Sequence, residues 1–195
     1  MTHTEISKFE VMPGLPPYGP PAKAFPPGSS AVFSEGLVVR FFRANGTDWT
    51  GNFGGGFTRC TDVQMHPDGC RVIVVSCGAG YLIDPDDDTT SERLPSSVET
   101  LIWTPDRERL IVNDQGLRLA VLSADGSSRY TRRFSWDGIA DISTDGIRAW
   151  GIAFEPFQET WQPFTVVLDT LEVEGGTYSE SMFDRPRRWW QFWKP

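Results

Sequence analysis

The chain has 195 residues, of which 39% are hydrophobic and 13% aromatic, and its formal net charge is −8. This length suits about one domain with a core that needs no disulfides. An acidic chain argues against nucleic acid as the main partner, because proteins that bind nucleic acid present basic surfaces. No apolar run approaches the roughly 20 residues that span a membrane. The acidic charge is compatible with a basic protein partner.

The cysteines and the N-terminus predict a cytoplasmic protein. Three cysteines cannot form a closed disulfide framework, and residues 1–8 lack the apolar core of a signal peptide. A reducing compartment is the simple inference from these two features. Cys70 and Cys77 flank a predicted buried strand, where we expect each thiol to pack as a small apolar group.

Residues 1–30 are predicted to form a proline-rich N-terminal arm. Seven prolines lie between positions 13 and 27, which excludes a helix or a central strand there. We expect an extended segment that wraps the domain, with Leu15, Tyr18 and Phe25 as its packing points. The alternative is a ligand for a proline-recognition domain.

Residues 31–180 are predicted to form one domain of repeated β-structure. Strands are expected at residues 31–33, 37–42 and 49–53, with a hairpin turn at Asn45-Gly46. The glycines at positions 54–56 predict a turn or bulge, because no Gly-Lys-Ser/Thr sequence comes after them to form a nucleotide loop.

The stretch from Asp62 to Asp86 contains the pattern that repeats. Pro67 and Gly69 predict a tight turn, and the β-branched run at residues 72–75 predicts a strand buried on both faces. A glycine corner at residues 78–80 then leads into another strand.

The same pattern returns twice along the chain. The turn aspartates are Asp68, Asp106 and Asp145, which lie 38 and 39 residues apart, and the third unit carries an insertion at residues 155–163. A period of about 40 residues with four short strands is typical of propeller blades. We therefore predict an all-β fold: a small or incomplete β-propeller-like repeat of antiparallel four-stranded units. The alternative is an open antiparallel meander or curved sheet.

Motifs for catalysis and for cofactor binding are missing from the sequence. Of two histidines, only His66 lies outside the terminus, which leaves little basis for a histidine-based triad or metal site. Asp84, Asp86 and Asp88 resemble the start of a calcium loop. The sixth position is a threonine instead of glycine and the twelfth is a proline instead of glutamate, so a solvated acidic turn is favoured. We predict no cofactor and no metal ion.

Three carboxylates and several tryptophans remain as candidate binding residues. Asp62, Glu99 and Asp141 lie near the first strand of each unit, and in a propeller these strands line the central channel. Converging carboxylates could hydrolyse a glycoside or bind a cation, and the alternative is three independent polar residues. Trp49 is a further binding candidate. The core is nonetheless the more common place for Trp49, Trp103, Trp136, Trp150 and Trp161, although some of them could line a recognition face.

Residues 181–195 are predicted to form a basic, aromatic C-terminal tail. Four aromatic residues occur within residues 189–193, and the candidate binding residues among them are Trp189, Trp190 and Trp193. From Asp184 onward the charge is +3, which leaves −11 on the rest of the chain. This composition suits docking onto the acidic body or onto an anionic membrane surface.

Five stretches carry a family resemblance that covers roughly residues 30–178. They are Ser34–Phe41, Trp49–Phe53, Gly78–Pro85, Trp161–Asp169 and Gly175–Tyr178. Together they resemble small, uncharacterised bacterial proteins with β-propeller-like repeats. The resemblance concerns strands and turns, so it implies no activity. It does imply that the chain could be an immunity partner of a toxin.

The function that these observations favour is a non-catalytic, cytoplasmic protein-binding protein, such as an immunity or scaffold partner of another bacterial protein. One alternative is a hydrolase that uses the carboxylates at the centre of the repeats. Another is a membrane-peripheral protein docked by its Trp-rich tail. The sequence sets no oligomeric state.

Overall fold

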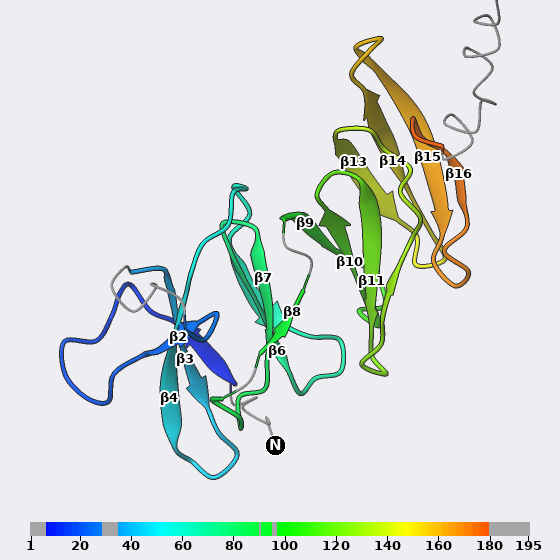
Figure 1. The fold of residues 1–195 in the computed structure, drawn as a ribbon. Coiled ribbons are helices and arrows are strands. Elements are labelled where there is room, and N and C mark those ends of the chain that lie inside the picture. The colour runs from blue at the N-terminus through cyan, green and yellow to red at the C-terminus, as the bar shows by residue number, and fades with distance from the viewer. Residues whose placement is uncertain (1–6, 29–34, 90, 95–96, 180–195) are drawn as a thin grey trace, which may run out of the picture.

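The computed structural model describes residues 7–28, 35–89, 91–94 and 97–179. Within these residues the regular elements are all β-strands, and they form four separate four-stranded sheets (Figure 1). No helix in the described part of the chain is long and apolar enough to cross a membrane. The predicted all-β class is therefore confirmed.

The sheets succeed one another along the chain. Sheet A holds β1 (Phe9–Val11), β2 (Lys23–Phe25), β3 (Leu37–Phe42) and β4 (Asp48–Phe53). Sheet B holds β5 (Asp62–Met65), β6 (Val72–Ser76), β7 (Ala79–Ile83) and β8 (Glu92–Arg93). Sheet C holds β9 (Val98–Trp103), β10 (Arg109–Asp114), β11 (Arg118–Ser123) and β12 (Ser128–Tyr130). Sheet D holds β13 (Ile139–Thr144), β14 (Arg148–Glu155), β15 (Thr160–Val167) and β16 (Val173–Gly175).

Sheets B, C and D are antiparallel meanders, in which each strand pairs with the next one in the sequence. Their first hairpins turn at the three aspartates that define the sequence repeat. The predicted insertion at residues 155–163 lengthens one hairpin, so that β14 and β15 are the eight-residue strands of sheet D.

Sheet A is built differently from the other three. Its centre is the predicted β3–β4 hairpin, and its two edge strands come from the N-terminal arm. β2 pairs with β4 in parallel. Phe25 is buried as expected, but Leu15 and Tyr18 are exposed, so the prediction that they pack on the domain is wrong. The predicted strand at residues 31–33 lies outside the described residues.

The sheets pack face to face in the order A, B, C, D, with one hydrophobic cluster between each neighbouring pair. Phe53 and Val74 belong to the cluster between A and B, and Val75 and Val112 to the cluster between B and C. Ile111 belongs to the cluster between C and D. Sheets B and C are therefore buried on both faces, which explains the unbroken apolar runs in their sequences.

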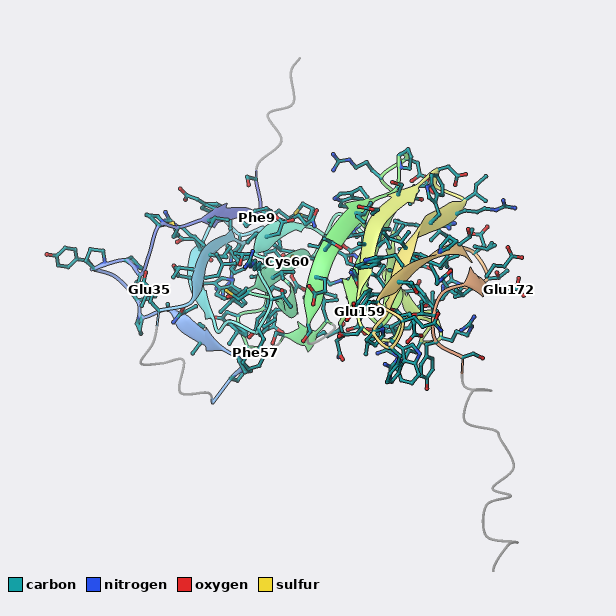
Figure 2. All side chains as sticks on the ribbon, turned by 90° about the horizontal axis from the view of Figure 1, so that it is seen from above. Phe9, Glu35, Phe57, Cys60, Glu159 and Glu172 are labelled. Atoms are coloured by element: carbon teal, nitrogen blue, oxygen red, sulfur yellow. The ribbon has the colours of Figure 1, made fainter. Side chains whose placement is uncertain are left out.

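The series does not close into a ring. Sheet A lies at one end of the molecule and sheet D at the other, as Phe9 and Glu172 mark in Figure 2. The four sheets are separate, so they do not form one continuous curved sheet. The fold is an incomplete β-propeller-like repeat with one outward-facing sheet surface at each end.

The turn before β6 is held by the carboxylate of Asp68. It accepts hydrogen bonds from the backbone N–H groups of Cys70 and Arg71, at 2.8 and 3.0 Å, and from Nε of Arg71 at 2.6 Å. Burial of the carboxyl group acts to raise its pKa, but these hydrogen bonds outweigh burial and lower the pKa of Asp68 to about 2. The ionised carboxylate therefore stabilises the folded state.

Acid should remove this stabilisation within a defined pH window. Because the folded-state pKa is below the unfolded value of about 3.8, the contribution is complete above about pH 4 and is lost as the pH falls toward 2. The expected loss is about 2 kcal/mol in the free energy of unfolding. Urea denaturation between pH 5 and pH 2 would measure it. In Asp68→Asn the free energy of unfolding should no longer fall in this way between pH 4 and pH 2. The same fall in the variant as in wild type would contradict the prediction.

The thiols do not lie where the sequence placed them. Cys70 and Cys77 are exposed, and each lies in a turn next to β6 instead of on the buried strand itself. The prediction that they pack as apolar core groups is wrong. Cys60 is half-buried, and burial raises the pKa of its thiol, with Asp62 and Glu99 adding to the effect.

Candidate functional site

The three carboxylates singled out from the sequence lie on the first strands of sheets B, C and D. Asp62 begins β5, Glu99 lies on β9 and Asp141 lies at a bulge of β13, and all three are exposed. The charges of Asp62 and Glu99 both raise the pKa of the Cys60 thiol, and Asp141 makes no such contribution. Among the described residues, no group of three His, Cys, Asp or Glu side chains is placed to hold a metal ion.

His66 is a buried turn residue. Its ring Nδ1 accepts the backbone N–H of Asp68 at 3.1 Å, and its side chain is fully buried. Burial lowers the pKa of His66, so the imidazole is neutral at pH 7. A neutral ring enclosed in a turn is a structural element of the hairpin.

Trp49 belongs to the core between sheets A and B instead of to a binding surface. The indole is 7% exposed, stacks on Phe41 at 4.5 Å and donates a hydrogen bond from Nε1 to the carbonyl oxygen of Pro85 at 2.8 Å. Its position on the strand explains this burial, because Trp49 shares the inward face of β4 with Phe53. The other candidate tryptophans, Trp189, Trp190 and Trp193, lie outside the described residues.

A repeated arginine joins each unit to the next one. Arg71 and Arg109 each lie three residues after the turn aspartate of their unit, at the start of the second strand. Nη2 of Arg71 donates to the carbonyl oxygen of Gly126, in the β11–β12 turn of sheet C, at 3.2 Å. Nη2 of Arg109 pairs with the carboxylate of Asp169, in the β15–β16 turn of sheet D, at 2.6 Å. The same position thus contacts the same turn of the following sheet.

Arg148 occupies this position in sheet D, the last sheet of the series. It lies three residues after Asp145 and begins β14. The guanidinium is exposed, and it has no ion-pair or hydrogen-bond partner among the described residues. Sheet D therefore carries the arginine that contacts the following sheet in the earlier units, but no sheet of the series follows it.

The side chains beside Arg148 continue this interface. Along β14, Ala149 and Ala153 face sheet C, so the alternate residues Trp150, Ile152 and Phe154 face outward. Trp150 is 42% exposed. The corresponding outward residues of β6 and β10 are buried against the next sheet.

The neighbouring strand extends the same apolar surface. Trp161 on β15 pairs in register with Phe154, their rings lie 5.0 Å apart, and Trp161 is 46% exposed. We call this surface the open face and define it by its six main residues. They are Arg148, Trp150, Ile152, Phe154, Trp161 and Pro163.

The outward surface of sheet A is different in chemistry. Its central strands present Arg40, Asp48 and Thr50 together with Val38 and Phe42, and Arg40 Nε pairs with the Asp48 carboxylate at 2.7 Å. Polar and charged side chains of this kind remain hydrated, as in the capping units of repeat proteins. On the outward surface of sheet D, the open face instead has two half-exposed indoles. Clustered exposed aromatic residues mark interaction sites.

Sequence reasoning missed the open face because it placed Trp150 and Trp161 in the core. The signal that could have found it is the arginine three residues after each turn aspartate. That repeat shows which side of each second strand points toward the following unit. For the last unit, the same side must lack a neighbour within the series.

Comparisons with known proteins bear on the fold alone. No family model matches the sequence, and no curated protein matches it. Among solved structures, a protein assigned as TolB from Agrobacterium tumefaciens is 15% identical with a TM-score of 0.38, over 60% of this chain and 46% of that one. A protein assigned as a 6-phosphogluconolactonase from Bacteroides fragilis is 15% identical with a TM-score of 0.43, over 74% of this chain and 51% of that one. Dihydro-heme d1 dehydrogenase NirN is 17% identical with a TM-score of 0.46, over 73% of this chain and 32% of that one.

These three proteins are β-propeller-like. The chain spans about half of their length or less. At such identities and TM-scores their activities say nothing about this chain. The function has to be argued from the open face.

Proposed function

We propose that this chain is a non-catalytic protein-binding protein whose partner docks on the open face. One observation carries the proposal: Arg148 and Trp150 repeat the positions that sheets B and C bury against the following sheet. A surface built like an internal interface has the apolar area and the charged anchor that a protein partner requires.

The chemistry of the face sets the groups that the partner must offer. Trp150 and Trp161 call for an apolar surface that excludes water from both indoles. Arg148 calls for a carboxylate or a carbonyl oxygen, as Asp169 and Gly126 supply to its two counterparts. The acidic body further supports a partner with a basic periphery.

The biological setting is part of the same proposal. An immunity role toward another bacterial protein, which the sequence resemblance implies, or a scaffold role would use this face. We place the activity in the cytoplasm, in keeping with three cysteines that form no disulfide.

Replacing both indoles should abolish binding. Hot-spot tryptophans contribute about 2 kcal/mol or more each, so Trp150→Asp with Trp161→Asp should weaken capture by roughly 1,000-fold. The measurement is affinity capture from lysate of the producing cells, with quantitative mass spectrometry of proteins retained by wild type and by the variant.

The matched control carries the same charge change on two exposed aromatic residues elsewhere. Tyr18→Asp with Phe57→Asp alters side chains that are 88% and 99% exposed and lie off the open face. A partner should be retained by wild type and by this control, and lost by the open-face variant. Equal retention by all three proteins would rule out the open face as the binding site.

The hydrolase alternative has less support. Asp62, Glu99 and Asp141 are exposed, and only Asp62 and Glu99 both influence the thiol of Cys60, with no such link to Asp141. Glycoside hydrolysis needs two carboxyl groups about 5–9.5 Å apart across one substrate. The membrane-peripheral alternative depends on residues 185–195, which lie outside the described residues.

A further inference from the structure

We propose that, in the absence of a partner, the C-terminal segment of this chain, residues 184–195, covers the open face of sheet D. The inference concerns the same surface as the proposed function but does not rest on it. Its basis is the difference between the two ends of the sheet series, the place where the described chain ends, and the chemistry of residues 184–195.

Sheet A, at the N-terminal end of the series, is bordered by other segments of the chain. There the N-terminal arm supplies both edge strands of sheet A, and the outward side carries the Arg40–Asp48 ion pair beside Val38, which is buried. Sheet D has no such treatment within the described residues, because Trp150 and Trp161 are half exposed. An apolar terminal face of a repeat array needs a cap to remain in water.

The described chain ends at the level of Phe154, packed against residues 132–136, which connect sheets C and D. After β16, the hydroxyl of Thr177 donates to the carbonyl oxygen of Phe154 at 2.9 Å, and the ring of Tyr178 lies edge-on to Trp136 at 5.0 Å. Phe154 is the open-face residue whose ring lies 5.0 Å from that of Trp161, in a tilted arrangement. The last described residues therefore lie level with Phe154 and Trp161 along sheet D.

The remaining length is sufficient to cross the face. Sixteen residues come after Ser179, and in an extended form they reach about 50 Å. The eight-residue strand β14 spans roughly 26 Å. The attachment also raises the effective concentration of the segment at the face to the millimolar range, about 1 mM or more.

The segment and the face are complementary in chemistry. Trp189, Trp190 and Trp193 would be shielded from water against the indoles and Phe154 of sheet D. The segment carries +3, and exposed carboxylates border the face at Glu159 and Glu174, whereas Arg148 on the face has the same sign as the segment. Glu174 lies on the outward side of β16, in register with Thr165.

Photo-crosslinking of the full chain tests the inference directly. Trp190 is replaced by p-benzoylphenylalanine, the purified protein is irradiated without a partner, and the crosslinked peptides are mapped by mass spectrometry. We expect a monomer-sized product in which position 190 is joined to residues 148–165. A crosslink to this face in a dimer-sized product would assign it to a second copy and overturn the inference. Scattered crosslinks, or none, would also overturn it.

Three further samples make the result specific. Trp150→Gln with Trp161→Gln removes the indoles from exposed positions and should reduce the intramolecular crosslink at least tenfold, whereas Tyr18→Gln with Phe57→Gln should leave it unchanged. Anionic vesicles of phosphatidylserine and phosphatidylcholine form the third sample. Crosslinks that appear only to lipid, in the absence of the intramolecular product, would count against the inference.

The outcome is separable from that of the proposed function. If the segment covers the face and a partner also binds there, deleting residues 184–195 should increase capture of that partner several-fold. If the crosslink is found but the open-face variant captures the same proteins as wild type, the segment inference stands and the protein-binding proposal fails.

Discussion

Replacing Phe53 by alanine is expected to lower the free energy of unfolding by about 3–5 kcal/mol. Phe53 is fully buried on β4, and its ring lies 4.9 Å from that of Phe25 and 5.2 Å from that of Tyr81. These residues come from β2 and β7, so the ring joins the N-terminal arm, the β3–β4 hairpin and sheet B. Its removal leaves a cavity at the junction of all three.

The matched control is Phe57→Ala, four residues along the chain. Phe57 is 99% exposed, so losing its ring should change the free energy of unfolding by no more than about 0.5 kcal/mol. Urea denaturation followed by tryptophan fluorescence compares the two variants. Similar midpoints for Phe53→Ala and wild type would mean that sheet A does not pack on sheet B through this ring.

The repeat was predictable because the turns and the buried strands leave strong local signals. Aspartate at each first hairpin, with glycine after it in sheets B and D, reflects turn geometry, and apolar runs such as residues 72–75 reflect two-sided burial. Both depend on residues close in sequence. Sheet B, sheet C and most of sheet D could therefore be predicted from the sequence.

The predictions that failed depend on contacts between distant residues. β1 and β2 are three-residue edge strands whose partners lie about 30 residues away, and a proline-rich segment gives no periodic signal for such pairing. The exposure of Trp150 depends on whether another layer of the protein lies against the outer side of sheet D. The alternation of residues in a strand's sequence is the same whether another layer covers its outer face or leaves it open.

The open face also explains why the chemistry of the site could not be read from motifs. The open face consists of ordinary strand residues in an unusual setting. Arg71 and Arg148 have the same sequence context, but only Arg71 has a sheet beside it. The difference is one of position in the series, which only the order of the sheets reveals.

Replacing Ile111 by aspartate should unfold most of the protein at pH 7. Ile111 is fully buried on β10, and its side chain lies in the cluster between sheets C and D with Val121 and Phe134. An ionised carboxylate placed there has no polar partner, and such a group costs several kcal/mol, on the order of the 5–15 kcal/mol that holds a domain folded. Circular dichroism and urea denaturation would show the loss.

The pH dependence of that variant separates a buried charge from a simple loss of packing. Burial raises the pKa of the introduced carboxyl group above its unfolded value, so the folded state binds a proton more readily. Stability should therefore recover in part as the pH falls from 7 toward 5, before the loss at Asp68 begins near pH 4. Ile147→Asp places the same group at a position that is 65% exposed and should show neither the loss nor the recovery. Equal behaviour of the two variants would mean that sheet C is not enclosed by sheet D, and the stacked order of the sheets would have to be abandoned.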